Sequence, residues 1–394
     1  MKAGSLFRCV WVFAALSVSP VSGDAGIKAG IDTQAAENTS KELVPFTWDK
    51  VPVWAGVGKE YDFTEQELDF LASHYSLIFL EKNQGFSQYK DAATGFIEAC
   101  RQIKKRNPSV KVLFYWNALI SWPFYEVNQN LPDEFFLKDS RGQFILVHNN
   151  KHRLFNLASA DMRKWWCAAA ADVVTRSGAD GLFSDAYISV SHPYVKSIMD
   201  AKTFRAINEG ASALVKETAA ALGPDKINLI NGLRCGDGGQ FAPLASGVLI
   251  EEFGYHDWKD ATKEQLAADI QTISDTAKSG KIVCVKAWTG FLHWTDKDKD
   301  MAKKPHAELL QLARERITFQ LACFLAGAER NCYFFYSWGW AENEGVFDWY
   351  PELDKPLGPP LGPAVRTGWV FKREFAHASV SVNLENKTAQ IDWK

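Results

Sequence analysis

The stretch Gly181-Leu182-Phe183-Ser184-Asp185-Ala186-Tyr187 begins after a turn signal, continues through residues suited to a buried strand and reaches a carboxylate. A similar pattern occurs at Gly247-Val248-Leu249-Ile250-Glu251-Glu252-Phe253, where an acid again stands four positions after the glycine. A parallel strand buried on both faces tolerates an ionised side chain only where the strand leaves the core. The two stretches therefore predict two strand ends that present carboxylates at the mouth of a β/α barrel.

Segments typical of strands and helices alternate along the chain around these two stretches. The expected strands are 51–57, 77–80, 110–115, 181–185, 227–230, 247–253, 282–285 and 332–336. The expected helices are 63–74, with a capping box formed by Thr64 and Glu67, and 92–106, 161–177, 204–222, 262–279 and 307–326. Eight such units are typical of a (β/α)8 barrel, and no GxGxxG or P-loop motif favours an open nucleotide-binding sheet. We therefore expect an α/β fold, a TIM barrel over residues 44–350, with a long excursion at 121–160.

The two ends of the chain differ from this pattern. Lys2 and Arg8 flank a short apolar run that leads to small residues, which is typical of a signal peptide covering residues 1–25. The alternative is a buried N-terminal helix. Residues 26–43 are small and polar and predict a leader, whereas 351–394 alternate and predict a β-hairpin or two packed on the barrel. We expect a secreted or periplasmic protein.

Composition limits the classes of partner. The net charge is −3 and there is no basic run, which argues against nucleic acid or an anionic membrane as the main partner. Six cysteines remain after the expected signal cleavage without a CxxC pair, so buried free thiols are favoured over disulfides and zinc. His148 and His152 stand four apart in a turn-like segment without a third ligand. We expect a monomer without a cofactor or metal, and without a membrane partner after cleavage.

In β/α barrels the working groups lie at the C-terminal ends of the strands. Hydrolysis of a glycosidic bond needs two carboxyl groups, one to protonate the leaving oxygen and one to attack the sugar or activate water. Asp185 is the first candidate. Glu251 has the same offset from its glycine and is favoured over Glu252, and the remaining acid would form a salt bridge with Lys286 or Arg234.

Further candidates at or near the strand ends would bind a sugar. Sugar rings stack on indoles, and their hydroxyls pair with amides and charged groups. The chain has 15 tryptophans, several of them near strand ends. The expected substrate-binding residues are Glu81, Trp116, Asn117, Tyr187, Asn231, Tyr255, Lys286, Trp288, Trp338 and Trp340. For Glu81, an ion pair with a neighbouring lysine is an equally good interpretation. We expect a polysaccharide or oligosaccharide as the substrate.

The stretches 179–185 and 247–253 resemble the strand-four and strand-six motifs of the hypothetical glycosyl hydrolase family numbered fifteen. The endo-α-1,4-polygalactosaminidase barrels are its relatives. The segments 137–142, 155–157 and 163–166, and the tail at 373–375 and 380–383, are also similar to these proteins. The resemblance implies a (β/α)8 barrel that hydrolyses glycosidic bonds, with Asp185 and Glu251 as the matching acids. Asn156 stands where the family commonly has an aspartate.

The main hypothesis is a secreted glycoside hydrolase with a two-carboxylate mechanism. In it Asp185 is the nucleophile or base and Glu251 is the general acid. The second hypothesis is a carbohydrate-binding barrel without catalytic activity. The third is a polysaccharide lyase on the same scaffold, with Lys286 or a tyrosine as its base.

Overall fold

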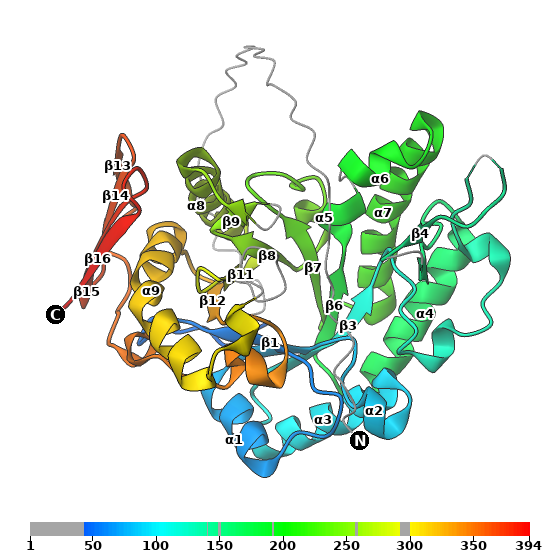
Figure 1. Ribbon diagram of the computed structural model, residues 1–394, viewed down its shortest axis with the longest axis horizontal. Coiled ribbons are helices and arrows are strands. Elements are labelled where there is room, and N and C mark those ends of the chain that lie inside the picture. The colour runs from blue at the N-terminus through cyan, green and yellow to red at the C-terminus, as the bar shows by residue number, and fades with distance from the viewer. Residues whose placement is uncertain (1–42, 140, 149–150, 191–192, 257–258, 292–299) are drawn as a thin grey trace.

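Eight short apolar segments form the parallel strands of one sheet at the centre of the computed structural model (Figure 1). The structure describes residues 43–139, 141–148, 151–190, 193–256, 259–291 and 300–394. The strands, in sheet order, are β1 (Trp54–Val57), β2 (Leu77–Leu80), β3 (Lys111–Asn117), β6 (Gly181–Asp185), β7 (Ile227–Leu233), β8 (Gly247–Phe253), β11 (Ile282–Ala287) and β12 (Cys332–Tyr336). A parallel bridge from Val53 to Phe334 connects the first strand to the last. The predicted (β/α)8 barrel is confirmed.

Helices surround this barrel (Figure 1). They are α1 (Glu65–His74), α2 (Phe86–Tyr89), α3 (Ala92–Arg106), α4 (Ala160–Ser177), α5 (Tyr187–Val190), α6 (Pro193–Ser197), α7 (Ala201–Leu222), α8 (Lys263–Lys278) and α9 (His306–Gly327). The capping box of Thr64 and Glu67 is present at the start of α1. Helix α7 begins three residues before the predicted start because the side chain of Asp200 caps its first turn.

The two glycines of the repeated pattern are required by strand packing. A Cβ at Gly181 would lie 2.0 Å from the carbonyl oxygen of Ile227 on the neighbouring strand β7. A Cβ at Gly247 would lie 2.6 Å from the Cβ of Ile282 on β11. Both distances are shorter than real contacts, so only glycine lets the neighbouring strands approach this closely. The glycine therefore marks where each acid-bearing strand enters the sheet.

The excursion after β3 is a structured extension of the rim. It contains the strands β4 (Leu146–Val147) and β5 (His152–Arg153), which pair antiparallel, and two short 3₁₀ helices, η1 (Glu126–Asn128) and η2 (Asp133–Phe135). The hydroxyl of Tyr125 donates to the carbonyl oxygen of Tyr115 at 3.0 Å and so ties the excursion to β3. An antiparallel bridge pairs Lys138 with Phe144 within the excursion.

Smaller elements follow the later strands. Strands β9 (Tyr255–His256) and β10 (Lys259–Asp260) form a short antiparallel pair beyond β8. The 3₁₀ helices η3 (Ala242–Leu244), η4 (Met301–Lys303) and η6 (Pro351–Asp354) and the π-helical turn η5 (Glu342–Val346) lie in connections.

The chain ends in a separate antiparallel sheet beside α9 (Figure 1). Its strands are β13 (Val365–Thr367), β14 (Val370–Glu374), β15 (Ala378–Asn383) and β16 (Thr388–Trp393). Arg373 is buried between sheet and helix, where its guanidinium donates to the carbonyl oxygens of Leu325, Ala326 and Ala328. The same side chain pairs with Glu329 at 3.2 Å. Because the last carbonyl groups of a helix lack intrahelical donors, Arg373 fastens the sheet to the end of α9.

The predictions for the N-terminus lie outside the described residues, which begin at residue 43. Within the described ranges, none of the helices has both the length and the apolar character needed to cross a bilayer. The six cysteines after the expected signal peptide are free thiols, as predicted, and all except Cys235 are buried.

We predict that Arg373→Met lowers the free energy of unfolding by about 3 kcal/mol, because it leaves Glu329 and the end of α9 without their buried donor. Urea denaturation followed by tryptophan fluorescence measures the change. Lys372→Met is the matched control, since Lys372 is exposed on the same strand, and we expect a change below ~0.5 kcal/mol. Equal losses in both variants would contradict the anchoring role of Arg373.

Candidate active site

Aromatic rings fill the barrel below its C-terminal rim. Phe79 on β2 and Phe183 on β6 stack with ring centroids 4.1 Å apart. Trp54 packs against Phe79, and Trp340 packs on both rings from the segment after β12. Trp340 keeps part of its surface exposed. A carboxyl group at this rim therefore lies above an apolar floor, where its charge is poorly solvated.

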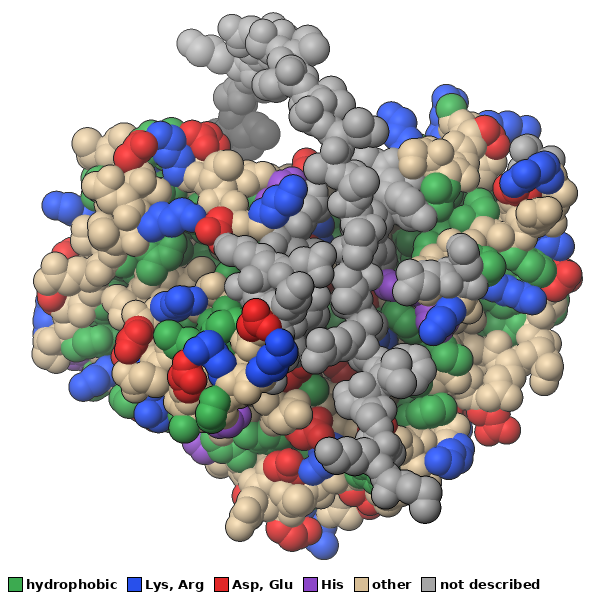
Figure 2. Space-filling view, in the orientation of Figure 1, with side chains coloured by type: hydrophobic (Ala, Val, Ile, Leu, Met, Phe, Trp, Pro, Cys, Tyr) green, Lys and Arg blue, Asp and Glu red, His purple; other side chains and the backbone are tan. Residues whose placement is uncertain are grey.

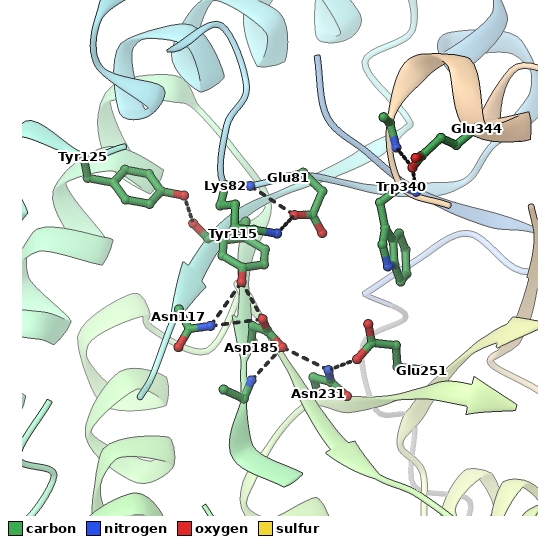
Figure 3. A network of polar contacts seen from close by, with 12 residues as sticks. Glu81, Lys82, Tyr115, Asn117, Tyr125, Asp185, Asn231, Glu251, Trp340 and Glu344 are labelled. Carbon is green, nitrogen blue, oxygen red and sulfur yellow. Dashed lines mark hydrogen bonds and ion pairs between the residues drawn. The ribbon is translucent and has the colours of Figure 1, made fainter. Parts of the chain in front are cut away.

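Asp185, the last residue of β6, lies at the centre of a network of donors (Figure 3). Its Oδ2 accepts from the hydroxyl of Tyr115 and from Nδ2 of Asn117 at 3.0 Å. Its Oδ1 accepts from Nδ2 of Asn231 at 2.9 Å and from the backbone N–H of Ala186 at 2.6 Å. Hydrogen bonds donated to a carboxylate stabilise its ionised form.

The neighbouring strands hold these donors in place. Asn117 is the register partner of Asp185 across β3 and β6. Its Oδ1 accepts from the backbone N–H groups of Leu119 and Ile120, so its Nδ2 is directed toward Asp185. Ala186 has a φ of 73°, a left-handed conformation that a non-glycine residue rarely adopts. Such strain is typical of functional sites, and here it accompanies the backbone donation to Asp185.

Glu251 points toward Asp185 from β8 (Figure 3). Its Oε2 accepts from the same Nδ2 of Asn231, at 2.7 Å, so one amide nitrogen joins the two acids. Burial, followed by the charges of Asp185 and Glu252, raises the pKa of Glu251 to about 7, whereas the hydrogen bond from Asn231 lowers it. The pairing of β7 with β8 shifts between Asn231 and Leu233, an irregularity common beside active sites.

Glu252 does not join the two acids. Its buried carboxylate forms an ion pair with Arg234, which is one of the two salt bridges foreseen for the acid not used. Because side chains alternate along a strand, neighbours such as Glu251 and Glu252 leave β8 on opposite faces. The structure thus distinguishes the two candidates, because Glu251 accepts from Asn231 whereas Glu252 pairs with Arg234.

Glu81 follows β2 and forms an ion pair of 2.7 Å with Lys82, the alternative that the sequence offered. Both residues lie beside Tyr115 in Figure 3. The ammonium group of Lys82 is 5.4 Å from the ring centroid of Tyr115 and 5.5 Å from that of Trp122. Lys82 therefore connects the carboxylate network with the excursion after β3.

Several predicted sugar-binding residues are buried away from Asp185 and Glu251. Trp116 is 2% exposed and packs on Trp166 of α4, because on β3 it faces outward between Tyr115 and Asn117. Tyr187 lies against Phe241 outside the barrel. Trp338 is buried against Phe291 and His306.

Lys286 is also buried, and its amino group donates to the backbone oxygen and the hydroxyl of Ser337 at 2.6 and 2.8 Å. It lies 4.0 Å from the ring centroid of Trp288. Burial lowers the pKa of Lys286 well below its ordinary value. These contacts make Lys286 part of the packing below the rim, not a group that a sugar would touch.

Trp288 and Tyr255 form the wall behind Glu251. The indole N–H of Trp288 donates to the backbone oxygen of Glu251 at 2.7 Å. Its ring meets that of Trp340 edge to face at 6.0 Å. Both Trp288 and Tyr255 are buried, so they support Trp340 and Glu251 from behind. Trp340 is thus the predicted aromatic residue that remains open to a ligand.

Tyr115 belongs to the site but was not among the residues predicted from the sequence. Its hydroxyl donates to Asp185, and burial, with the charges of Asp185 and Glu81, raises its pKa well above the ordinary value. The phenol therefore remains a hydrogen-bond donor at neutral pH. The signal was available, since Tyr115 and Asn117 stand two apart on one strand and so share a face.

Among the described residues, no group of three or more His, Cys, Asp and Glu side chains is arranged to hold a metal ion. His148 and His152 instead pack on the ring of Trp122, with centroids 5.2 and 4.8 Å away. Burial lowers the pKa of His148 to about 4, so its imidazole is neutral at neutral pH.

The amino-acid sequence matches the model of a known protein family. The model of hypothetical glycosyl hydrolase family 15 matches residues 104–379. The chain belongs to that family. The match includes β6 with Asp185 and β8 with Glu251. A comparison with curated proteins found no match for this family 15 chain.

Two solved structures resemble this family 15 chain at low sequence identity. The maltogenic α-amylase AmyB from Thermotoga neapolitana has a TM-score of 0.51 and 10% identity, over 85% of this chain and 86% of the amylase. Ega3 from Aspergillus fumigatus, in complex with galactosamine, has a TM-score of 0.40 and 14% identity, over 69% of this chain and 92% of Ega3. The α-amylase likeness shows a shared barrel fold.

We predict that Asn231→Ala raises the pKa of Glu251 above about 7, by roughly one unit or more, because it removes a donor that stabilises the ionised form. Carbon-detected NMR titration of the glutamate carboxyl groups measures this pKa. Asn228→Ala is the matched control, since Asn228 is buried on the same strand but donates to Val215. An unchanged pKa in Asn231→Ala would contradict the bridging role.

Proposed function

We propose that this family 15 protein is a secreted glycoside hydrolase that cleaves a polysaccharide or oligosaccharide with a two-carboxylate mechanism. Membership of a glycosyl-hydrolase-like family and a barrel shared with an α-amylase support a carbohydrate-active protein. The observation that carries the proposal is the amide nitrogen of Asn231, which joins the carboxyl groups of Asp185 and Glu251. Secretion rests on the sequence of residues 1–25.

Glu251 acts as the general acid in this proposal. With its pKa raised to about 7, it holds a proton at neutral pH far more often than an ordinary glutamic acid. It donates that proton to the glycosidic oxygen as the bond to the anomeric carbon breaks. The leaving sugar departs as a neutral alcohol, and Glu251 is left as a carboxylate.

Asp185 acts as the nucleophile, forming a bond to the anomeric carbon as the leaving group departs. The Asp185 and Glu251 oxygens that share Asn231 can be no farther apart than the sum of their two hydrogen-bond lengths. Because this limit on the two nearest oxygens lies close to the ~5–5.5 Å carboxyl separation of retaining enzymes, the proposal takes retention of configuration. Glu251 then removes a proton from water, whose oxygen displaces Asp185 from the sugar.

Trp340 offers the apolar face for a sugar ring. It is partly exposed at the rim, and Phe79, Phe335 and Trp288 fix its ring. Its backbone N–H donates to Glu344 at 2.9 Å, which holds the segment after β12 in place. A sugar stacked on this indole would lie next to Glu251 (Figure 3).

We predict that Asp185→Ala and Glu251→Gln each lower kcat by roughly 10²–10⁴, because each removes a group that acts on the breaking bond. Release of reducing ends from the best substrate of a polysaccharide panel measures kcat. Sodium azide should restore turnover to Asp185→Ala and yield a glycosyl azide, since a small anion can occupy the place of the lost nucleophile. Aryl glycosides with good leaving groups should give Glu251→Gln a rapid first release of the aryl alcohol, because bond cleavage then needs no general acid, whereas later turnover stays slow because Glu251 is also the base of the second step.

Asp172→Asn on α4 is the control for this pair, because Asp172 lies on the surface with Arg176. Glu252→Gln should lose less activity than Glu251→Gln at equal folded fraction. Sugar binding with no product from the native protein would instead indicate a carbohydrate-binding barrel. Products with a new ultraviolet-absorbing double bond would indicate a lyase.

The role of Glu251 as general acid also predicts how activity depends on pH. We expect kcat/KM to fall about tenfold per pH unit above about 7, because deprotonation removes the general acid from the free enzyme. Initial rates between pH 5 and about 9 measure the profile. In Asn231→Ala the descending limb should move to higher pH together with the pKa of Glu251. A flat profile to about pH 9 would remove Glu251 from the role of general acid.

A further inference from the structure

A cleft of about 520 Å³ lies in the excursion after β3. Its volume is within the range of small-molecule binding sites, about 300–1,000 Å³. The lining residues share an apolar base and a polar edge: Trp122, Pro123, Leu131 and Phe136, with Ser121, Asn128, Gln129, Asn130, Lys151, His152 and Arg153. On the side of the molecule where Figure 1 draws β4, Figure 2 shows basic, histidine and hydrophobic side chains close together.

The cleft is connected to the proposed catalytic centre through Trp122 and Lys82. Trp122 lines the cleft, and its ring centroid is 5.5 Å from the ammonium group of Lys82. The same ammonium group is 5.4 Å from the ring of Tyr115, whose hydroxyl donates to Asp185. A sugar chain that passes over Asp185 toward the excursion would therefore reach the cleft.

Backbone contacts give the cleft a fixed shape. The N–H of Ser121 donates to the carbonyl oxygen of Arg153 at 3.0 Å, which joins the two sides. Nδ2 of Asn128 donates to the carbonyl oxygen of Trp122 at 2.8 Å. Tyr125 fastens this segment to β3. A preorganised site loses less conformational entropy when a ligand binds.

The charge of the cleft is positive. Lys151 is exposed, and the residues that line the cleft include Lys and Arg but neither Asp nor Glu. Arg153 forms an ion pair with Asp133 at 3.7 Å, which is longer than a hydrogen bond. Asp133 is 63% exposed and also pairs with Lys138, so it neutralises the charge of Arg153 only in part.

The guanidinium of Arg153 has a fixed orientation. It lies 3.9 Å from the ring centroid of Phe144 and 5.1 Å from that of Phe136. Stacking on a ring leaves the edge of the guanidinium available, and its planar fork matches a carboxylate. Burial and the charge of Lys151 lower the pKa of His152, so its imidazole is a neutral partner for a hydroxyl at neutral pH. The cleft thus combines a guanidinium that can bind a carboxylate with apolar rings and amides.

We propose that this cleft is a subsite for a sugar unit that carries a carboxylate, so that the substrate is a polysaccharide containing uronic acids. This inference rests on the proposed glycoside hydrolase function. Arg153 and Lys151 bind the carboxylate, the amides of Gln129 and Asn130 bind hydroxyls, and the ring edges of Trp122 and Phe136 line the base. The subsite binds a unit of the chain next to those at the catalytic acids.

The test uses the Glu251→Gln variant of the full chain, so that ligands are bound without being cleaved. Isothermal titration compares hexamers of galacturonic acid and of glucuronic acid with their fully methyl-esterified forms, which have the same sugars without charge. A galactosamine hexamer is the cationic probe. We expect at least one acidic hexamer to bind about tenfold or more tightly than its ester, with an affinity that falls as salt rises.

The variant Lys151→Glu in the same background should weaken that acidic hexamer about tenfold and leave its ester unchanged, because it reverses one charge at the cleft. Lys372→Glu, an exposed lysine of β14, is the matched control and should have no effect. Equal affinities for acids and esters, or equal effects of the two charge reversals, would overturn the inference. Fluorescence-monitored unfolding checks that both variants are folded.

Hydrolysis assays of the unmodified protein distinguish a failure of the proposed subsite from a failure of the proposed hydrolase function. Cleavage of neutral polysaccharides, with no preference for acidic hexamers in binding, would overturn the subsite but retain the hydrolase. Selective binding of acidic hexamers, with no cleavage of any polysaccharide, would overturn the hydrolase but retain the subsite.

Discussion

The amide nitrogen of Asn231 is the contact on which the candidate site depends, since it donates to Asp185 and to Glu251 together. Two carboxylates this close repel each other, and for Glu251 this repulsion adds to the effect of burial. Asp185 has four donors, whereas burial and the charge of Asp185 raise the pKa of Glu251. One bridging side chain thus holds two acids at a short distance.

Strand geometry decides which residues can reach this bridge. On β3, Tyr115 and Asn117 face Asp185, whereas Trp116 between them faces α4 and packs on Trp166. On β7, Asn228 faces the helices and donates to Val215, whereas Asn231 faces Asp185. The shift in register after Asn231 changes the alternation where β7 leaves the sheet. A residue at a strand end therefore belongs to the site only if it lies on the inner face.

This geometry explains how far the sequence could predict the molecule. Apolar runs and helix caps follow from local chemistry, so the eight strands, the capping box at Thr64 and the barrel could be predicted. The strand-end rule also identified Asp185, Asn117, Asn231 and Glu251, which the structure brings together. It could not sort the aromatic residues, because Trp338 is buried against Phe291 and His306 from distant parts of the chain, whereas Trp340 stays partly exposed. Such long-range packing leaves no local pattern in the sequence.

The excursion after β3 adds positive charge to a rim whose centre carries carboxyl groups. Asp185, Glu251 and Glu81 form an acidic centre, and the ion pair of Glu81 with Lys82 offsets part of it on the side of Trp122. Beyond Trp122 the lining becomes basic, with Lys151 and Arg153. A chain with carboxylates at intervals gains attraction at the excursion and meets repulsion at the centre, so its register along the rim is fixed by charge as well as by shape. A neutral chain would experience neither force, and a cationic chain would be held in the opposite register.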